Sequence, residues 1–517
     1  MLPHAGVPYL AEVEGLKSSL TFGLRVSGIV LIAYLLQLLS MDIFPLEFDE
    51  GVNILIGHFI QAGYQPYTEI SVSHLPLFVG LFGTLWDITA GDMLLSKAIW
   101  IGLNTISLIS VGYLGRRLLG EKMALLGVAF LVMSTSYLAV STSITPALLS
   151  LLFATLSFLL VSVYLGKANR VWLFLAGCSL AIGILIDLLA SHVILVLLLL
   201  LMARNSSALR WDDGWIRLSP SWKAFVLDII LLLVGSFFTF IVFSFTFEWK
   251  TVYDSTIIYR LSLREAIPFS IQDNLRVLLQ FLDENSLLFL GMFVGLVFAQ
   301  THAKHVVWFL FIWWMIAAFW VMVQVPSQKT QVAALWAPMA LIASWGFYRL
   351  SAWSIDGVQS KWERLNQTGI SAGHVVGLIL VLYAVWNLYQ IPGLVNRLQD
   401  IRDEEDLRQF QAVPQAVSFL QEITSPDDCV ISDDPVLSLK AHRFSPPVLA
   451  DLSDARIASG VVNLELIEAL AIENNCTALV ATSHRFKESI PDLTSWAEEF
   501  YPRYVNLEGI RIYHRLP

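Results

Sequence analysis

Long apolar runs recur through the first three quarters of the chain and are separated by short polar segments. A helix needs about 20 mainly apolar residues to cross the ~30 Å hydrocarbon layer of a bilayer. Candidate spans lie at residues 22–41, 93–114, 123–141, 146–165, 171–187, 190–203, 224–246, 286–300, 307–324, 332–348 and 372–390. A mean hydropathy of +0.66 is incompatible with one soluble core. The pattern predicts an α-helical, multi-spanning membrane protein with about eleven spans.

The positions of Lys and Arg between these runs predict how the chain crosses the membrane. Basic residues cluster after the second, fourth, sixth and tenth runs, for example Arg116 and Arg117. Residues 42–92 contain seven acidic residues and no Lys or Arg. Because cytoplasmic loops carry the excess of positive charge, we expect a cytoplasmic N-terminus. An odd number of spans then leaves the C-terminus outside the cytoplasmic (plasma) membrane.

The acidic segment 42–92 contains two helical patterns that we do not interpret as spans. Residues 51–62 are amphipathic. Residues 75–88 are apolar but only about fourteen long, and a crossing there would move Arg116 and Arg117 outside. We therefore predict two interfacial helices that form a folded lid on the outer membrane surface.

The composition changes after the last run, because the chain beyond Gln390 is rich in Asp, Glu and Pro. Strands are expected at 430–432, 448–450, 478–480 and 510–513, and a helix at 464–473. We predict a transmembrane domain at 1–392 and a small extracytoplasmic α/β domain at 393–517. Cys429 and Cys476 form a disulfide if this domain faces an oxidising compartment, or remain two free thiols; both alternatives stay open.

Charge narrows the possible partners. The formal net charge is −10, and no basic stripe interleaved with aromatic residues occurs, which argues against nucleic acid. The three cysteines lack the spacing of a metal site. The lipid bilayer is therefore the first partner to consider, and candidate chemistry belongs at its surface.

Asp49 and Glu50 are adjacent carboxylates that closely follow the first apolar run. They would lie where a lipid-linked substrate and a water-borne one meet. One interpretation is structural: they orient the chain or stabilise the start of a helix near Gly51. The other is functional: the pair supplies an anchor for a metal or an acceptor, or a general base, since a glycosyl transfer would need a carboxylate that takes the proton from an incoming hydroxyl.

Outer basic and aromatic residues are the second set of candidates. Arg260, which follows Tyr259, and Lys329 would lie outside, against the orientation bias, and cations near the membrane plane suit a polyprenyl phosphate. Long loops also tolerate charge without such a role. His74 would bind a phosphate or an acceptor, or only complete a turn. The candidates for sugar contact are Tyr64 and Tyr67, although aromatic belts at membrane interfaces are common.

Together these motifs resemble the polytopic GT-C glycosyltransferases of the protein-mannosyltransferase and aminoarabinose-transferase kind. The resemblance extends over nearly the whole chain and is carried by residues 48–51, 63–67, 73–78, 115–118, 329–338 and 432–435. It implies inverting transfer of a sugar from a polyprenyl-phosphate donor to a glycan, lipid or protein acceptor outside the membrane. It further implies that Asp49 is the base, and that His74 and Lys329 help to bind the donor phosphate.

Two positions depart from the pattern of that family. Residues 144–147 lack the acidic residue that many relatives carry at the start of the fourth span, and Asp187 stands where many have Lys. The donor sugar and any requirement for a divalent cation therefore stay open. Two alternatives to the enzyme also stay open: a transporter or lipid flippase, and a non-catalytic GT-C-like binding protein. The chain lacks the repeats and matched helix breaks typical of transporters.

Overall fold

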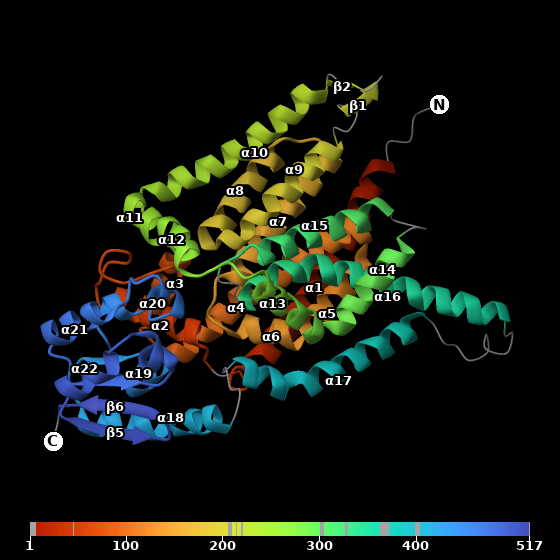
Figure 1. Ribbon diagram of the computed structural model, residues 1–517. Coiled ribbons are helices and arrows are strands. Elements are labelled where there is room, and N and C mark those ends of the chain that lie inside the picture. The colour runs from red at the N-terminus through yellow and green to blue at the C-terminus, as the bar shows by residue number, and fades with distance from the viewer. Residues whose placement is uncertain are drawn as a thin grey trace, which may run out of the picture.

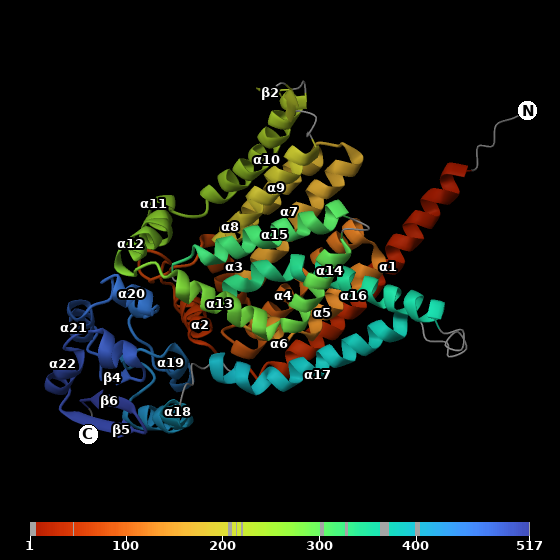
Figure 2. The ribbon, with the colours of Figure 1, turned by 45° about the vertical axis from the view of Figure 1, so that its right-hand side comes forward.

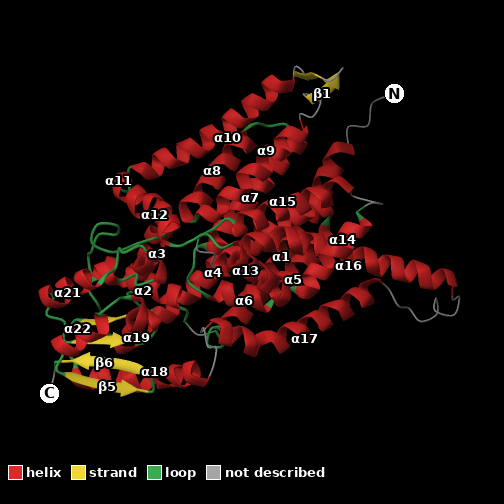
Figure 3. Cartoon of the chain, in the orientation of Figure 1, coloured by secondary structure: helices red, strands yellow, loops and turns green. Residues whose placement is uncertain are grey.

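The computed structural model describes most of the chain. The described residues are 7–44, 46–204, 209–212, 215–218, 221–299, 304–325, 329–361, 372–398 and 404–515. Helices dominate, and the strands gather mainly in the C-terminal part (Figure 3).

The first part of the chain is a bundle of helices (Figure 1). Its elements are α1 (Val7–Ser40), α2 (Phe48–Gln61), α3 (Pro76–Ile88), α4 (Met93–Leu119), α5 (Glu121–Met133), α6 (Thr135–Thr142), α7 (Ala147–Lys167), α8 (Val171–Ile186), η1 (Leu188–Ser191), α9 (His192–Arg204), β1 (Leu209–Asp212), β2 (Trp215–Leu218), α10 (Ser221–Ser244), α11 (Trp249–Tyr253), η3 (Asp254–Ile258), α12 (Tyr259–Ala266), α13 (Ile271–Glu284), α14 (Ser286–Phe298), α15 (Lys304–Met322), η4 (Lys329–Val332), α16 (Ala333–Lys361) and α17 (Ala372–Leu398).

Each predicted span falls mainly on helix, and the count of about eleven crossings stays a prediction. Within the described residues, six helices are long and apolar enough to cross a membrane, or up to eight if each of two bent pairs is one span. α5 and α6 meet at a bend of 70°, and α13 and α14 at 87°. The first bend occurs at Ser134, which leaves the helical conformation and accepts a hydrogen bond from the Tyr137 amide. Apolar periodicity alone does not reveal such a break.

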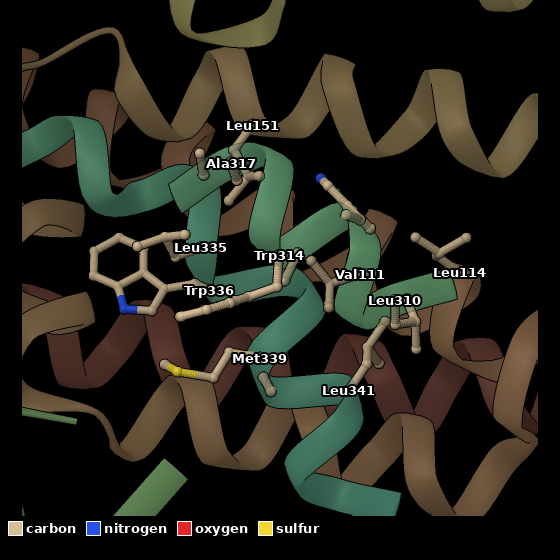
Figure 4. Packing of buried hydrophobic residues seen from close by; sticks show 14 of the residues in the cluster. Val111, Leu114, Leu151, Leu310, Trp314, Ala317, Leu335, Trp336, Met339 and Leu341 are labelled. Atoms are coloured by element: carbon tan, nitrogen blue, oxygen red, sulfur yellow. The ribbon is translucent and has the colours of Figure 1, made fainter. Parts of the chain in front are cut away.

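α16 lies at the centre of the bundle. Leu335, Trp336 and Met339 are fully buried, and Figure 4 places them among side chains of neighbouring helices such as Leu151 and Ala317. A helix that is apolar on every side is expected to be enclosed in this way. By contrast, α10 and α17 leave most of their apolar surface exposed, as expected of helices that face lipid.

Glycines allow α14 and α16 to approach closely. Gly291 and Gly295 form a G-x-x-x-G pair on α14, and a Cβ at Gly346 of α16 would overlap their backbone atoms. Small residues at such spacing let two helix backbones come into contact, and the gain is van der Waals packing.

The chain ends in an α/β unit, Glu404–His514, here called the C-terminal unit. Its elements are α18 (Glu404–Ile423), β3 (Val430–Ser432), α19 (Pro435–Ala441), η6 (Pro447–Leu449), α20 (Asp454–Ala458), α21 (Leu464–Glu473), β4 (Ala478–Ala481), η7 (Arg485–Ser489), α22 (Leu493–Phe500), β5 (Arg503–Leu507) and β6 (Ile510–His514). The strand order is β3-β4-β6-β5, with β3 and β4 parallel and the other pairs antiparallel.

Three of the four predicted strands in this unit are confirmed, and one is wrong. The segment 448–450 is largely the 3₁₀ turn η6, because Pro446 and Pro447 cannot donate to a strand ladder. The strand β5 was not predicted; three of its five residues are exposed and none is fully buried. Cys429 and Cys476 form a disulfide, which decides between the two alternatives left open by the sequence.

The C-terminal unit packs against one end of the bundle. Figures 1 and 2 show it beside α2, α3 and α12, whereas the β1–β2 hairpin and the N-terminus lie toward the opposite end. The two helices predicted at residues 51–62 and 75–88 are confirmed as α2 and α3. They lie between the rest of the bundle and the C-terminal unit.

Substituting Gly346 with Ala should separate α14 from α16, since the added methyl group meets backbone that cannot move aside. We expect a loss of about 1–3 kcal/mol of unfolding free energy, measured as a lower melting temperature in detergent. Gly377→Ala on α17 is the matched control, because no atom lies within 4 Å of its added Cβ. Equal melting temperatures for the two variants would contradict the close approach.

Candidate active site

The helix α2 begins with the acidic pair that the sequence singled out. Glu47 has an extended conformation and precedes the first helical turn, which contains Asp49 and Glu50. Carboxylates at this position interact favourably with the partial positive charge of a helix N-terminus. Every residue from Glu50 to Gly57 is buried. The Glu50 carboxylate therefore lies in the interior of the protein.

Glu50 is held in a buried ion pair. Its carboxylate lies 3.0 Å from Lys97 Nζ of α4, and both side chains are at most 6% exposed. The Ile144 amide donates to the same carboxylate at 3.3 Å, and Asn53 Nδ2 donates to the Ile144 carbonyl at 2.8 Å. Burial raises the pKa of the Glu50 carboxyl, and Lys97 opposes that rise.

Asp49 is the accessible carboxylate of the pair. It is half-buried, whereas Glu50 is only 1% exposed. Successive residues of a helix point about 100° apart. Asp49 and Glu50 therefore face different surroundings, and only one of them can face a reacting centre. Asp49 is therefore better placed than Glu50 to exchange a proton with a substrate.

The C-terminal unit contacts the start of α2 directly. A Cβ at Gly51 would lie 3.0 Å from Cγ of Pro435, so α2 and α19 touch where only glycine fits without adjustment. The Arg485 guanidinium lies 3.8 Å from the ring centroid of Phe48. Farther along α2, His58 stacks on Phe444 at 4.1 Å. These contacts set the position of α2 relative to the C-terminal unit.

A second group of polar side chains surrounds His74, just before α3. Ser73 Oγ donates to Asp451 Oδ2 at 3.1 Å, and that carboxylate also accepts from Arg456 Nε at 2.9 Å. The Tyr67 hydroxyl donates to the His74 carbonyl at 2.9 Å. Burial lowers the pKa of His74 to about 4, with Asp451 acting in the opposite direction. The imidazole is therefore neutral at neutral pH.

Arg260 is the cation of this group that has no close carboxylate. Its charge acts on both His74 and Asp187, which belong to two other segments of the chain. Among the described residues, no carboxylate oxygen lies within the 4.0 Å ion-pair distance of the guanidinium. A half-buried guanidinium of this kind can accept a phosphate bidentately.

An aromatic core joins the two groups. Lys97 lies one turn before Trp100 on α4, and the Trp100 ring meets Phe78 at 5.4 Å. Phe78 in turn lies 5.0 Å from the His74 ring. The position of His74 and that of the Glu50–Lys97 pair thus depend on the same packed side chains.

The remaining predicted residues lie in different surroundings. Tyr67 and Tyr259 line one cleft, whereas Tyr64 is exposed and its ring meets the edge of Phe59 at 6.0 Å. Lys329 opens η4, but its side chain lies outside the described residues.

Three functional candidates could not be found by sequence reasoning. Asp451 and Arg456 reach the His74 group from more than 370 positions away along the chain. Lys97 lies 47 positions beyond Glu50, near the start of α4, and forms the buried ion pair with it. Only the fold brings these segments together.

A divalent cation has no evident cluster of ligands in the described part of the chain. No three His, Cys, Asp or Glu side chains gather there as a metal site would require. We therefore assign no chemical step to a metal.

Comparisons with known proteins complete the description. No family model and no curated protein matches the sequence. The crystal structure of ArnT from Cupriavidus metallidurans bound to undecaprenyl phosphate is 12% identical, with a TM-score of 0.61 over 95% of this chain and 98% of that one. Its apo form gives 10% identity and 0.56 over 96% and 98%.

This chain has the GT-C fold. The resemblance to aminoarabinose transferases inferred from the motifs is thus confirmed at the level of architecture. The archaeal oligosaccharyltransferase AglB from Archaeoglobus fulgidus is 13% identical and covers 88% of this chain and 69% of its own, at a TM-score of 0.48.

Replacing Lys97 with Met should leave Glu50 as an uncompensated buried charge and lower the unfolding free energy by about 3–5 kcal/mol. The pKa of Glu50 is already raised by burial and would rise further. When the pKa of a carboxyl is higher in the folded state than in the unfolded state, the unfolding free energy of the protein falls as the pH rises toward the folded-state pKa. The deficit, measured by thermal unfolding in detergent, should therefore be larger at pH 8 than at pH 5. Lys440→Met, at an exposed position, is the control, and a deficit independent of pH would contradict the pairing.

Proposed function

We propose that this protein is an inverting membrane glycosyltransferase that uses a polyprenyl-phosphate sugar donor on the outer face of the cytoplasmic membrane. The observation that carries the proposal is a chain of contacts just before α3, on a fold shared with ArnT: Asp451 binds Ser73 and Arg456, and Arg456 lies over the ring of Tyr259, the neighbour of Arg260. The bound lipid of that ArnT structure, undecaprenyl phosphate, is the class of ligand that a guanidinium at this place would hold.

The reaction assigns each group a separate task. The acceptor hydroxyl attacks the anomeric carbon, and the bond from that carbon to the phosphate oxygen breaks. The electron pair leaves with the polyprenyl phosphate, whose charge Arg260 stabilises. Asp49 takes the hydroxyl proton and later returns it to water. His74, being neutral, contributes a hydrogen bond rather than a charge.

Glu50 has a positioning role in this scheme. Its carboxylate is occupied by Lys97 and the Ile144 amide, so it holds the start of α2 and leaves the proton transfer to Asp49. Tyr259 and Tyr67 are assigned to the sugars, and Lys329 remains a proposed second cation for the donor. Tyr64 is assigned to the lid surface.

The proposed location of the C-terminal unit is extracytoplasmic. The Cys429–Cys476 disulfide supports this assignment, because such bonds persist mainly in oxidising compartments. The absence of Lys and Arg from residues 42–92 supports the same side for the adjoining first loop.

Asp49→Asn should reduce transfer by roughly 10²–10⁴-fold, the range attributed to a general base, while the bound donor remains detectable. Transfer is measured with radiolabelled lipid-linked sugar, and donor binding by native mass spectrometry. Asp87→Asn on α3, at an exposed position, is the matched control. Full activity of the Asp49→Asn variant would show that Asp49 is not the base. If the wild-type protein transfers no sugar but moves lipid across the membrane of liposomes, the flippase alternative is favoured.

Arg260→Gln should weaken binding of undecaprenyl phosphate by about tenfold or more, because a charge-assisted bidentate contact is lost. Arg264→Gln, one turn farther along α12 and exposed, should retain wild-type affinity. A titration of both variants with the lipid in detergent measures the difference. Equal affinities would remove Arg260 from the donor site.

A further inference from the structure

A cleft of about 370 Å³ lies where the bundle meets the C-terminal unit. Three segments distant in sequence form it: residues 67–72 between α2 and α3, residues 254–262 of η3 and α12, and part of 448–461. Figures 1 and 2 show these elements side by side around α12 and α20. The reaction scheme above leaves most of this cleft unassigned.

One wall of the cleft has unusual backbone geometry. Tyr67 has φ of 72°, a left-handed conformation that is an outlier for a bulky residue. Hydrogen bonds hold it there: its amide donates to the Ile70 carbonyl at 3.1 Å, and its hydroxyl donates to the His74 carbonyl. Backbone strain of this kind concentrates at ligand-binding and active sites.

The opposite wall is irregular as well. η3, Asp254–Ile258, is a π-helical turn between α11 and α12, and such turns are frequent at functional sites. Tyr259 follows it, and the Arg456 guanidinium lies 4.9 Å from the centroid of its ring. Because Asp451 neutralises Arg456, this arginine fixes the ring without adding net charge to the cleft.

The chemistry of the lining fits a carbohydrate. Two tyrosine rings offer apolar faces with hydroxyl edges, and several more hydroxyls and two carboxylates supply hydrogen-bonding groups. These groups come from Thr68, Ser71, Ser255, Ser262, Glu69 and Asp254. With Arg456 neutralised, the carboxylates disfavour anionic sugars. None of the strands lines the cleft in the described residues, so a peptide has no strand edge to pair with.

We propose that this cleft binds the acceptor, and that the acceptor is a neutral or amino-substituted glycan. The inference rests on the proposed transferase function and adds the class of acceptor to it. Tyr259 precedes Arg260 in the chain, and Tyr67 bonds to the carbonyl of His74. A glycan in the cleft is therefore held beside the groups assigned to the donor phosphate.

Saturation-transfer NMR on the full-length protein tests the cleft, in a detergent without a sugar headgroup and with no donor present. The probes are chitotriose, cellotriose and mannotriose, with trigalacturonate as the anionic comparison. At least one neutral probe should bind, and trigalacturonate should not. Val461→Trp fills the cleft from an exposed position and should weaken binding by about tenfold or more. Tyr253→Ala, an exposed tyrosine outside the lining, should have no effect.

The outcomes separate this proposal from the transferase itself. Asp49→Asn should bind the trisaccharide as the wild type does, because the measurement needs no proton transfer. If the protein transfers sugar but binds none of the neutral probes, or if Val461→Trp binds them normally, the cleft proposal is overturned. The transferase proposal is unaffected by either result. A serine-rich peptide whose binding is lost in Val461→Trp, with no glycan bound, would likewise overturn it. Glycan binding lost in Val461→Trp, without transfer from any lipid donor, supports the cleft and overturns the transferase.

Discussion

The ion pair between Glu50 and Lys97 determines where α2 and the loop that contains it lie on the bundle. A buried ion pair adds little net stability, because desolvation of both charges opposes their attraction. Its value here is positional: α2 can dock only where Glu50 meets Lys97 and Asn53 meets Ile144. That single placement leaves Asp49 accessible and presents Gly51 of α2 to the C-terminal unit.

The C-terminal unit contributes support to this arrangement. Asp433, in the Asp-Asp-Pro motif after β3, accepts hydrogen bonds from backbone and hydroxyl groups of Thr482 and Ser483. Asp434 caps α19 by accepting from the Val436 amide. Both carboxylates are thus used to hold α19 and its neighbouring turn, and α19 packs on α2. The motif therefore helps to position α2, and the contacts with Ser73 and Tyr259 extend the same support to the His74 group.

Charge is divided between neighbouring regions at this end of the molecule. Arg260 supplies a cation close to a neutral His74, whereas the adjoining cleft contains Glu69 and Asp254 and an arginine that is already paired. An anionic leaving group and an uncharged sugar chain require opposite surroundings. In the proposed reaction, this neighbouring arrangement would let the donor phosphate and the acceptor glycan bind at the same time in separate places.

The sequence alone determined the helical membrane class, the helices at each apolar run, the two helices α2 and α3 in the loop that follows the first run, and the α/β nature of the C-terminal part. These follow from local periodicity and composition, which act over a few turns of chain. Tertiary structure alone decided the bends beside Ser134 and Asn285, the Cys429–Cys476 bond, and the partners of Glu50 and His74. Ion pairs and hydrogen bonds between segments depend on how packed helices bring distant residues within about 3 Å, and no local pattern encodes that distance.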